Sequence, residues 1–194
     1  MKKILMVAVV AIVTTVGVCA QTSDEFKRHE VALSVGAWSN SQILSAFEHI
    51  GSVIVTAGTT SFQDESYVGP IAAEYFYHPK AWLGVGGIAA FGMNKQDAYF
   101  GGTYGGELKD TYYTLMPAVK FDWLRGKHFG MYSKAAVGAT LRTEKYDDKS
   151  ESTVHFNWQA SLLGMEVGSP QVRFFAELGF GEQGIFAAGL RYKF

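Results

Sequence analysis

Residues 171–194 of the chain, QVRFFAELGFGEQGIFAAGLRYKF, decide the fold class. In the last nine positions apolar and polar side chains alternate with a period of two, which is typical of a β-strand with one apolar face. Residues 172–180 repeat this alternation, and Glu182-Gln183-Gly184 are predicted to form a turn between the two segments. The end of the chain is therefore predicted to be a β-hairpin with one apolar and one charged face. The apolar face of its final strand carries Phe186, Ala188, Leu190, Tyr192 and Phe194.

Residues 1–20 have the pattern of a secretory signal peptide. A basic start, Lys2 and Lys3, precedes an apolar run and a small-residue cleavage site that ends at Ala20. Cleavage there would remove Cys19, the only cysteine, so the exported chain is predicted to need neither a disulfide nor a thiol. Lipidation of this cysteine is disfavoured, because valine rather than a small residue precedes it.

The rest of the chain has the size of one domain. Its slight excess of acidic over basic residues suggests no nucleic-acid partner. The sequence is rich in glycine and aromatic residues, and no later apolar run reaches the roughly 18 residues of a spanning helix. An exported chain of this kind is either a soluble β-fold or an outer-membrane barrel. We expect residues 21–29 to form a flexible arm and residues 30–194 to form the barrel domain.

Alternating segments before the hairpin bring the predicted number of strands to eight. Tight turns are expected after the second, fourth and sixth strands, and long loops after the first, third and fifth. The even number favours a membrane barrel with its tight turns in the periplasm, as do strands long enough for a tilted crossing of about 9 to 11 residues. Pro117 lies within the fourth strand, where its missing N–H predicts a β-bulge. The six earlier strands are predicted at residues 30–38, 67–77, 82–93, 110–123, 129–145 and 151–167, and loops at 56–66, 94–109 and 146–150.

The segment of residues 40–55 changes from strand to helical periodicity. Its apolar residues recur at the spacing of an amphipathic helix, with polar residues on the opposite side. This predicts one helix in the first outer loop. We expect it to cap the barrel mouth, with the membrane interface or an outside partner as alternatives. The candidate contact residues are Ile43, Leu44, Phe47 and Ile50.

Charged residues gather on one face of the predicted strands. Because an eight-stranded barrel has just enough room for side chains, charges of both signs on its inner face predict a lumen plugged by salt bridges. Aromatic residues crowd the strand ends, as the two interfacial belts of a membrane protein require. Glu166 is an outlier that falls on the apolar face. The predicted interior cluster comprises Glu74, Lys120, Asp122, Lys134, Arg142, Glu144, His155, Arg173, Glu177 and Arg191, with Lys193 on the same face.

The chain after residue 20 resembles the small eight-stranded outer-membrane barrels of Gram-negative bacteria, the family with the OmpX-like and OmpA-like barrel domains. The resemblance rests on the signal peptide, the strand count and the terminal Phe194. Leu190, Tyr192 and Phe194 resemble the closing-strand signal that the barrel assembly machinery recognises. The family resemblance implies an outer-membrane location, a monomer with both termini in the periplasm, and contact with membrane lipid and lipopolysaccharide.

The function predicted from these features is non-enzymatic: a structural role, or the presentation of outer loops to an external partner that the sequence does not identify. No catalytic residue, metal ligand or cofactor is predicted. An enzyme that modifies lipid A is a competing prediction, but Asn157 stands where the His-x-Ser arrangement of the deacylases it would resemble needs serine after His155. A narrow channel and a soluble, secreted ligand-binding barrel stay open as further candidate functions.

Overall fold

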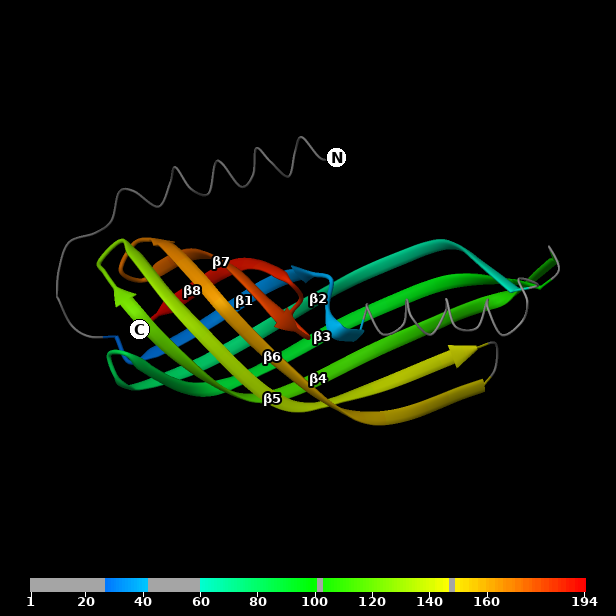
Figure 1. The fold of residues 1–194 in the computed structure, drawn as a ribbon, viewed down its shortest axis with the longest axis horizontal. Helices are drawn as coiled ribbons and strands as arrows, with labels where there is room; N and C mark the ends of the chain where they lie inside the picture. Colours follow the sequence, from blue (N-terminus) through cyan, green and yellow to red (C-terminus); the bar gives the residue numbers. More distant parts are fainter. Residues whose placement is uncertain (1–26, 42–59, 101–102, 147–148) are drawn as a thin grey trace, which may run out of the picture.

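The computed structural model of the protein describes residues 27–41, 60–100, 103–146 and 149–194, which form a closed antiparallel β-barrel (Figure 1). Each strand pairs with its neighbours in sequence, and the first pairs with the last. The predicted all-β barrel of eight strands is therefore confirmed. The strands are β1 (His29–Ala37), β2 (Thr60–Lys80), β3 (Leu83–Phe100), β4 (Thr103–Arg125), β5 (Phe129–Tyr146), β6 (Lys149–Gly168), β7 (Val172–Gly181) and β8 (Phe186–Lys193).

The first and last strands close the barrel at a point where the two ends of the described chain meet. The His29 amide donates to the Phe194 carbonyl at 3.0 Å, and the Phe194 amide donates to the His29 carbonyl at 2.9 Å. Because neighbouring strands are antiparallel, the turns that join β2 to β3, β4 to β5 and β6 to β7 lie at this same end. We call it the terminus end, and the opposite end the far end.

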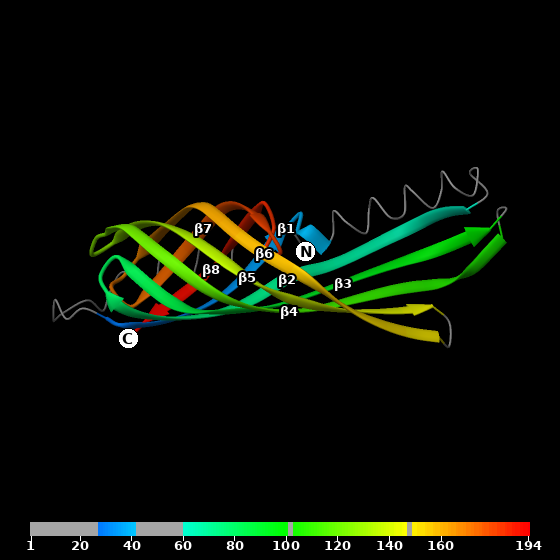
Figure 2. The same ribbon diagram turned by 60° about the horizontal axis from the view of Figure 1, so that its bottom comes forward.

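Strands β2 to β6 continue past the closed part of the barrel at the far end (Figure 2). The pairing of β1 with β2 ends at Val35 and Ile71, and that of β7 with β6 ends at Gly181 and Gln159. The far parts of these five strands therefore form an open sheet that projects from the barrel, which we call the sheet extension.

The prediction of a long loop at residues 94–109 is wrong. β3 runs to Phe100 and β4 starts at Thr103, and the two strands stay paired over this stretch, with Asn94 opposite Asp110. The polar, glycine-rich composition suggested a loop. Pairing with a neighbouring strand nevertheless satisfies the backbone hydrogen bonds, whichever side chains the strand carries. Likewise, strand structure covers residues 60–66 and most of the loop predicted at 146–150.

The helix predicted at residues 40–55 falls almost wholly outside the described residues. This applies to all four of its candidate contact residues, so their role stays a prediction. In the part of the chain that the structure describes, no helix is long and apolar enough to cross a membrane.

The outer face of the closed barrel is apolar, and aromatic side chains mark both of its borders. At the terminus end Trp82 stacks on Phe121 and Tyr192 on Phe194, with ring centroids 6.3 and 5.7 Å apart. At the far end Trp38 packs edge-on against Phe186 and Phe91 lies tilted against Tyr113, with ring centroids 5.8 and 5.3 Å apart. These pairs form two belts with aliphatic side chains between them, which is the surface that a bilayer requires. Leu33, Leu115 and Phe156 are 65–71% exposed, which a soluble barrel would not tolerate in such number.

The bulge predicted at Pro117 is absent. β4 pairs with β5 in one register on both sides of the proline, with Leu115 opposite Ala139 and Ala118 opposite Ala136. Around the proline, pairing is interrupted between these two pairs, and Pro117 itself points outward. The barrel therefore accommodates the missing donor as a local gap in one ladder, without an extra residue.

A bulge does occur in β6, where Leu162 and Leu163 together oppose Ser133. The register changes there against both β5 and β7. Because one extra residue reverses which face a side chain points to, Glu166 points inward rather than outward. The outlier of the sequence pattern is in fact a fully buried interior residue, only 1% exposed.

Candidate functional site

The interior of the closed barrel is built around Arg191 of β8. Its guanidinium donates to Glu166 Oε2 at 2.9 Å and to Glu74 Oε2 at 3.3 Å. The central carbon of the guanidinium, Cζ, also lies 4.6 Å from the Tyr132 ring centre and 4.4 Å from that of Phe175. Carboxylates and aromatic faces from four other strands thus hold one buried cation.

Lys134 of β5 forms a second centre of ion pairs, which shares Glu74 with Arg191. Its ammonium donates to Glu74 Oε1 and to Glu177, and the Tyr132 hydroxyl donates to Glu177 Oε1 at 2.6 Å. Glu177 also accepts a hydrogen bond from Ser161 at 2.7 Å. All these side chains are buried, so each carboxylate is compensated by cations or hydroxyl donors inside the barrel.

A third group of charges fills the interior towards the terminus end. Lys120 donates to Glu30 Oε1 at 2.7 Å and lies 3.4 Å from Asp122 Oδ1. His78 lies between the same two carboxylates, at 3.3 Å from Glu30 and 3.4 Å from Asp122. Because every member comes from β1, β2 or β4, this group ties one wall of the barrel together.

Glu166 connects the remaining cations at this end. It accepts a hydrogen bond from Arg173 Nη1 at 2.7 Å and another from Lys193 Nζ. The second terminal nitrogen of Arg173, Nη2, donates to the carbonyls of Gly126 and Lys127 in the turn between β4 and β5. The ion pairs therefore reach from the middle of the lumen to the turns at the terminus end.

The turn between β7 and β8 closes the interior at the far end. Glu182 and Gln183 were predicted to form the turn, and in the structure they are buried, at 2% and 1% exposure. The Glu182 carboxylate accepts hydrogen bonds from Ser41 Oγ and Asn157 Nδ2, both at 2.8 Å. The Gln183 side chain donates to Glu74 at 2.6 Å and joins this layer to the charged cluster. The hydrogen bonds at Glu182 come from neutral donors among the described residues.

Gly36 leaves the space that this inward turn occupies. A Cβ atom at Gly36 would lie 1.8 Å from the Gln183 carbonyl oxygen, so any side chain there would displace the turn. Gly184, the last residue of the turn, has a φ of 97°, which favours glycine. The glycine of the turn was a signal in the sequence for a tight turn here, but only the closed barrel shows that this turn points into the lumen.

The structure brings seven of the predicted interior residues into the enclosed cluster: Glu74, Lys120, Asp122, Lys134, Arg173, Glu177 and Arg191. Arg142 lies further towards the far end and is bound through two nitrogens to Asp110. Glu144, with a side chain 45% exposed, and the half-buried His155 are not enclosed. The sequence analysis missed Glu30, His78, Glu166, Glu182 and Gln183 as members of the buried network, and it gave Lys193 only as a residue of the same face.

This arrangement is suited to filling and stabilising the lumen. Arg191, Lys120, Lys134, Tyr132 and Phe175 are each no more than 2% exposed, so side chains occupy the cross-section at their level. Within the described residues, no three His, Cys, Asp or Glu side chains are placed to hold a metal ion. The assembly signal predicted at Leu190, Tyr192 and Phe194 lies on the outer surface near the terminus end, where each side chain is 43–49% exposed.

A closed eight-stranded barrel with an apolar belt outside and ion pairs inside has the architecture of a small outer-membrane β-barrel. No protein-family model matches the chain, and no curated protein matches it. Solved structures do match. The N-terminal β-barrel domain of Pseudomonas aeruginosa OprF is 11% identical, with a TM-score of 0.49, over 87% of this chain and 100% of that one. Ail, the attachment invasion locus protein of Yersinia pestis, is 13% identical with a TM-score of 0.42, over 87% and 97% of the two chains. A second structure of Ail, with the heparin analogue sucrose octasulfate, has a TM-score of 0.46 at 13% identity, over 86% and 99%.

Proposed function

We propose that the protein is a non-enzymatic outer-membrane barrel, exported with removal of residues 1–20, that anchors a surface-exposed sheet extension in the membrane. The observation that carries this proposal is the packed, ion-paired lumen. A structural anchor needs a rigid interior, and buried ion pairs whose partners are all present supply it.

Two features of the interior argue against a narrow channel. The layer around Arg191 fills the middle of the lumen, and the layer around Glu182 and Gln183 covers its far end. An ion would have to separate several buried charge pairs to pass both layers. Each separated pair would leave an uncompensated buried charge, and these penalties, about 3–5 kcal/mol when one partner of a pair is removed, would add over the pairs of both layers.

The sheet extension supports a role outside the membrane. Five strands continue beyond the level where β1 and β7 end, and these parts are not needed to close the barrel. With the terminus end in the periplasm, the extension faces the cell exterior, where lipopolysaccharide and an external partner are the candidate contacts. In the same proposal, the exposed Leu190, Tyr192 and Phe194 contact the barrel assembly machinery during insertion.

Three measurements test this proposal. The purified protein, refolded into a planar bilayer, is expected to give no large, steady conductance, and a reproducible open level would favour the channel instead. Mass spectrometry of lipid A from strains with and without the gene is expected to give the same spectrum. A gene-dependent change of acyl chains would favour the enzyme. Membrane fractionation is expected to place the protein with outer-membrane lipid, and recovery in the aqueous phase would contradict the proposal.

A further inference from the structure

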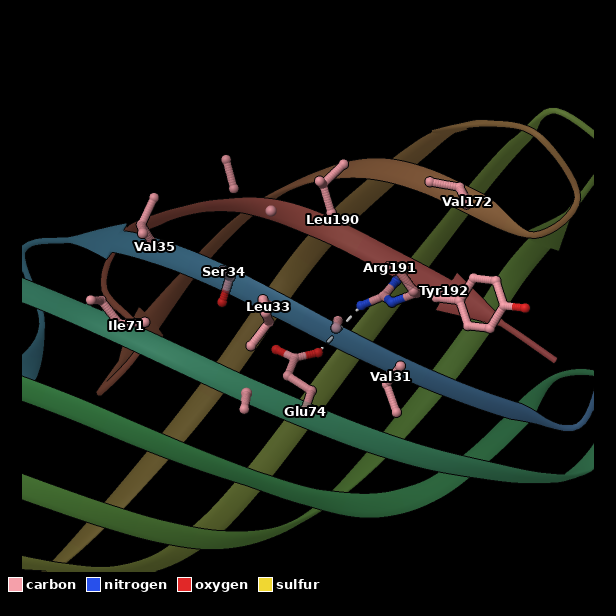
Figure 3. Close-up of a pocket in the computed structure, with 14 residues that line it drawn as sticks. Val31, Leu33, Ser34, Val35, Ile71, Glu74, Val172, Leu190, Arg191 and Tyr192 are labelled. Atoms are coloured by element: carbon pink, nitrogen blue, oxygen red, sulfur yellow. Dashed lines mark hydrogen bonds and ion pairs between the residues drawn. The ribbon is translucent and has the colours of Figure 1, made fainter. Parts of the chain in front are cut away.

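The outer surface of the barrel has an apolar groove along the seam where β1 pairs with β2 and β8. Its volume is about 770 Å³. In Figure 3, the row of Val31, Leu33 and Val35 on β1 runs between Ile71 of β2 and Leu190 of β8. The groove lies between the two aromatic belts and is therefore part of the surface that faces lipid.

Small residues on the neighbouring strands create the recess. Ala73 is paired with Leu33 on one side of β1, and Ala188 is paired with Val35 on the other. Each alanine leaves space beside a branched side chain that stands out from the surface, at 65% and 60% exposure. A flexible hydrocarbon chain can fill such a recess, whereas the convex wall of a second barrel would leave it empty.

At the terminus end the groove borders aromatic side chains, and two basic residues precede it in the chain. Tyr192 lines the groove, and its ring stacks on Phe194, which in turn stacks on His29. The residues directly before His29 are Lys27 and Arg28, which precede the groove in the chain by only a few positions. A cationic and aromatic border next to an apolar recess matches the phosphate and acyl chain of a lipid.

We propose that this groove binds one acyl chain of an anionic glycerophospholipid, with the lipid phosphate beside Lys27 and Arg28. This lipid would belong to the periplasmic leaflet, an assignment that rests on the orientation given under the proposed function. The groove and its basic end do not depend on that orientation. Binding at this place would cover the closing seam of the barrel and stabilise the pairing of β1 with β8.

The test uses the purified, delipidated protein in detergent with phosphatidylglycerol as the probe, and native mass spectrometry as the readout. The wild type is expected to retain one lipid per barrel. The double substitution Ala73→Leu and Ala188→Leu fills the groove and is expected to lower retention about tenfold, the effect of withdrawing roughly two methylene groups from apolar contact. The matched control, Ala135→Leu with Ala139→Leu, adds the same volume on the outer face of β5 and is expected to retain the lipid.

A charge variant tests the polar end of the site independently of the groove. Lys27→Gln is expected to reduce the preference for phosphatidylglycerol over zwitterionic phosphatidylcholine. Lys127→Gln, in the turn between β4 and β5 at the same end, is expected to leave it unchanged. A slower gel migration of the heated than of the unheated protein verifies that each variant is folded. If the double variant Ala73→Leu with Ala188→Leu fails to fold, Ala188→Leu alone replaces it. Equal lipid retention by the groove and control variants would overturn the proposal, and so would a dimer that only the groove substitutions abolish.

Discussion

Neutralising Glu166 is expected to be among the most damaging single charge changes in the barrel. The carboxylate is 1% exposed, accepts hydrogen bonds from Arg173, Arg191 and Lys193, and lies 3.9 Å from the ammonium of Lys120. The substitution Glu166→Gln keeps the shape and one oxygen acceptor but leaves four buried cations without their shared anion. Removing one partner of a buried pair costs about 3–5 kcal/mol, so we expect a loss of this size in the free energy of unfolding.

The assay is equilibrium unfolding in urea of the protein folded in lipid vesicles, followed by tryptophan fluorescence. Glu144→Gln is the matched control, because Glu144 also lies near a guanidinium, that of Arg142 at 3.4 Å, but its side chain is 45% exposed. Exposed pairs contribute about 0–1 kcal/mol, so the control should unfold nearly as the wild type does.

A second substitution distinguishes lost charge balance from lost packing. In the Glu166→Gln background, Lys193→Met removes one of the excess cations and keeps a similar length of side chain. The double variant is expected to recover part of the lost stability, with a coupling energy of about 0.5–3 kcal/mol. A loss below about 1 kcal/mol for Glu166→Gln, equal to that of the control, would refute the reasoning that Glu166 is an enclosed counter-charge.

Three further predictions concern the backbone and the orientation of the barrel. Pro117→Val restores an N–H at the gap between β4 and β5 and is expected to raise the free energy of unfolding by about 0.5–1.5 kcal/mol in the same urea assay. Any loss of stability would show that the proline is required there. Gly36→Ala should displace the turn between β7 and β8 and lower the free energy of unfolding in the urea assay, whereas Gly87→Ala should change it little because the atom nearest to the new Cβ is 3.5 Å away. Equal stability of the Gly36→Ala and Gly87→Ala variants would contradict the close packing of this turn against β1. A membrane-impermeant maleimide should label Ser150→Cys on intact cells but not Lys127→Cys, and the reverse pattern would invert the proposed orientation.

The sequence by itself determined the class of the fold and most of the interior cluster. The period of two in each strand separates an apolar from a charged face, so the strand count and most of the inward residues follow from the pattern alone. Arg191 and Leu190 illustrate this, because adjacent residues of β8 point to the lumen and to the lipid as predicted. Local alternation carries this information, since it depends only on neighbours in the chain.

The prediction of a loop at residues 94–109 was wrong, because a polar, glycine-rich composition does not prevent a segment from pairing. Whether a polar segment stays paired depends on the strand opposite it, and β3 and β4 support one another there. The gap at Pro117 also depends on the neighbouring strands. The proline lacks a donor only towards β5, so its pairing with β3 is kept.

The tertiary structure alone decided how the lumen is completed. The inward direction of Glu166 depends on one extra residue in β6, and the burial of Glu182 and Gln183 depends on the space that Gly36 leaves on a strand remote in sequence. Register and direction are properties of pairs of strands. A pattern along one strand therefore gives its two faces. Only the closed barrel determines where a bulge exchanges inward and outward positions and which charged side chains form pairs.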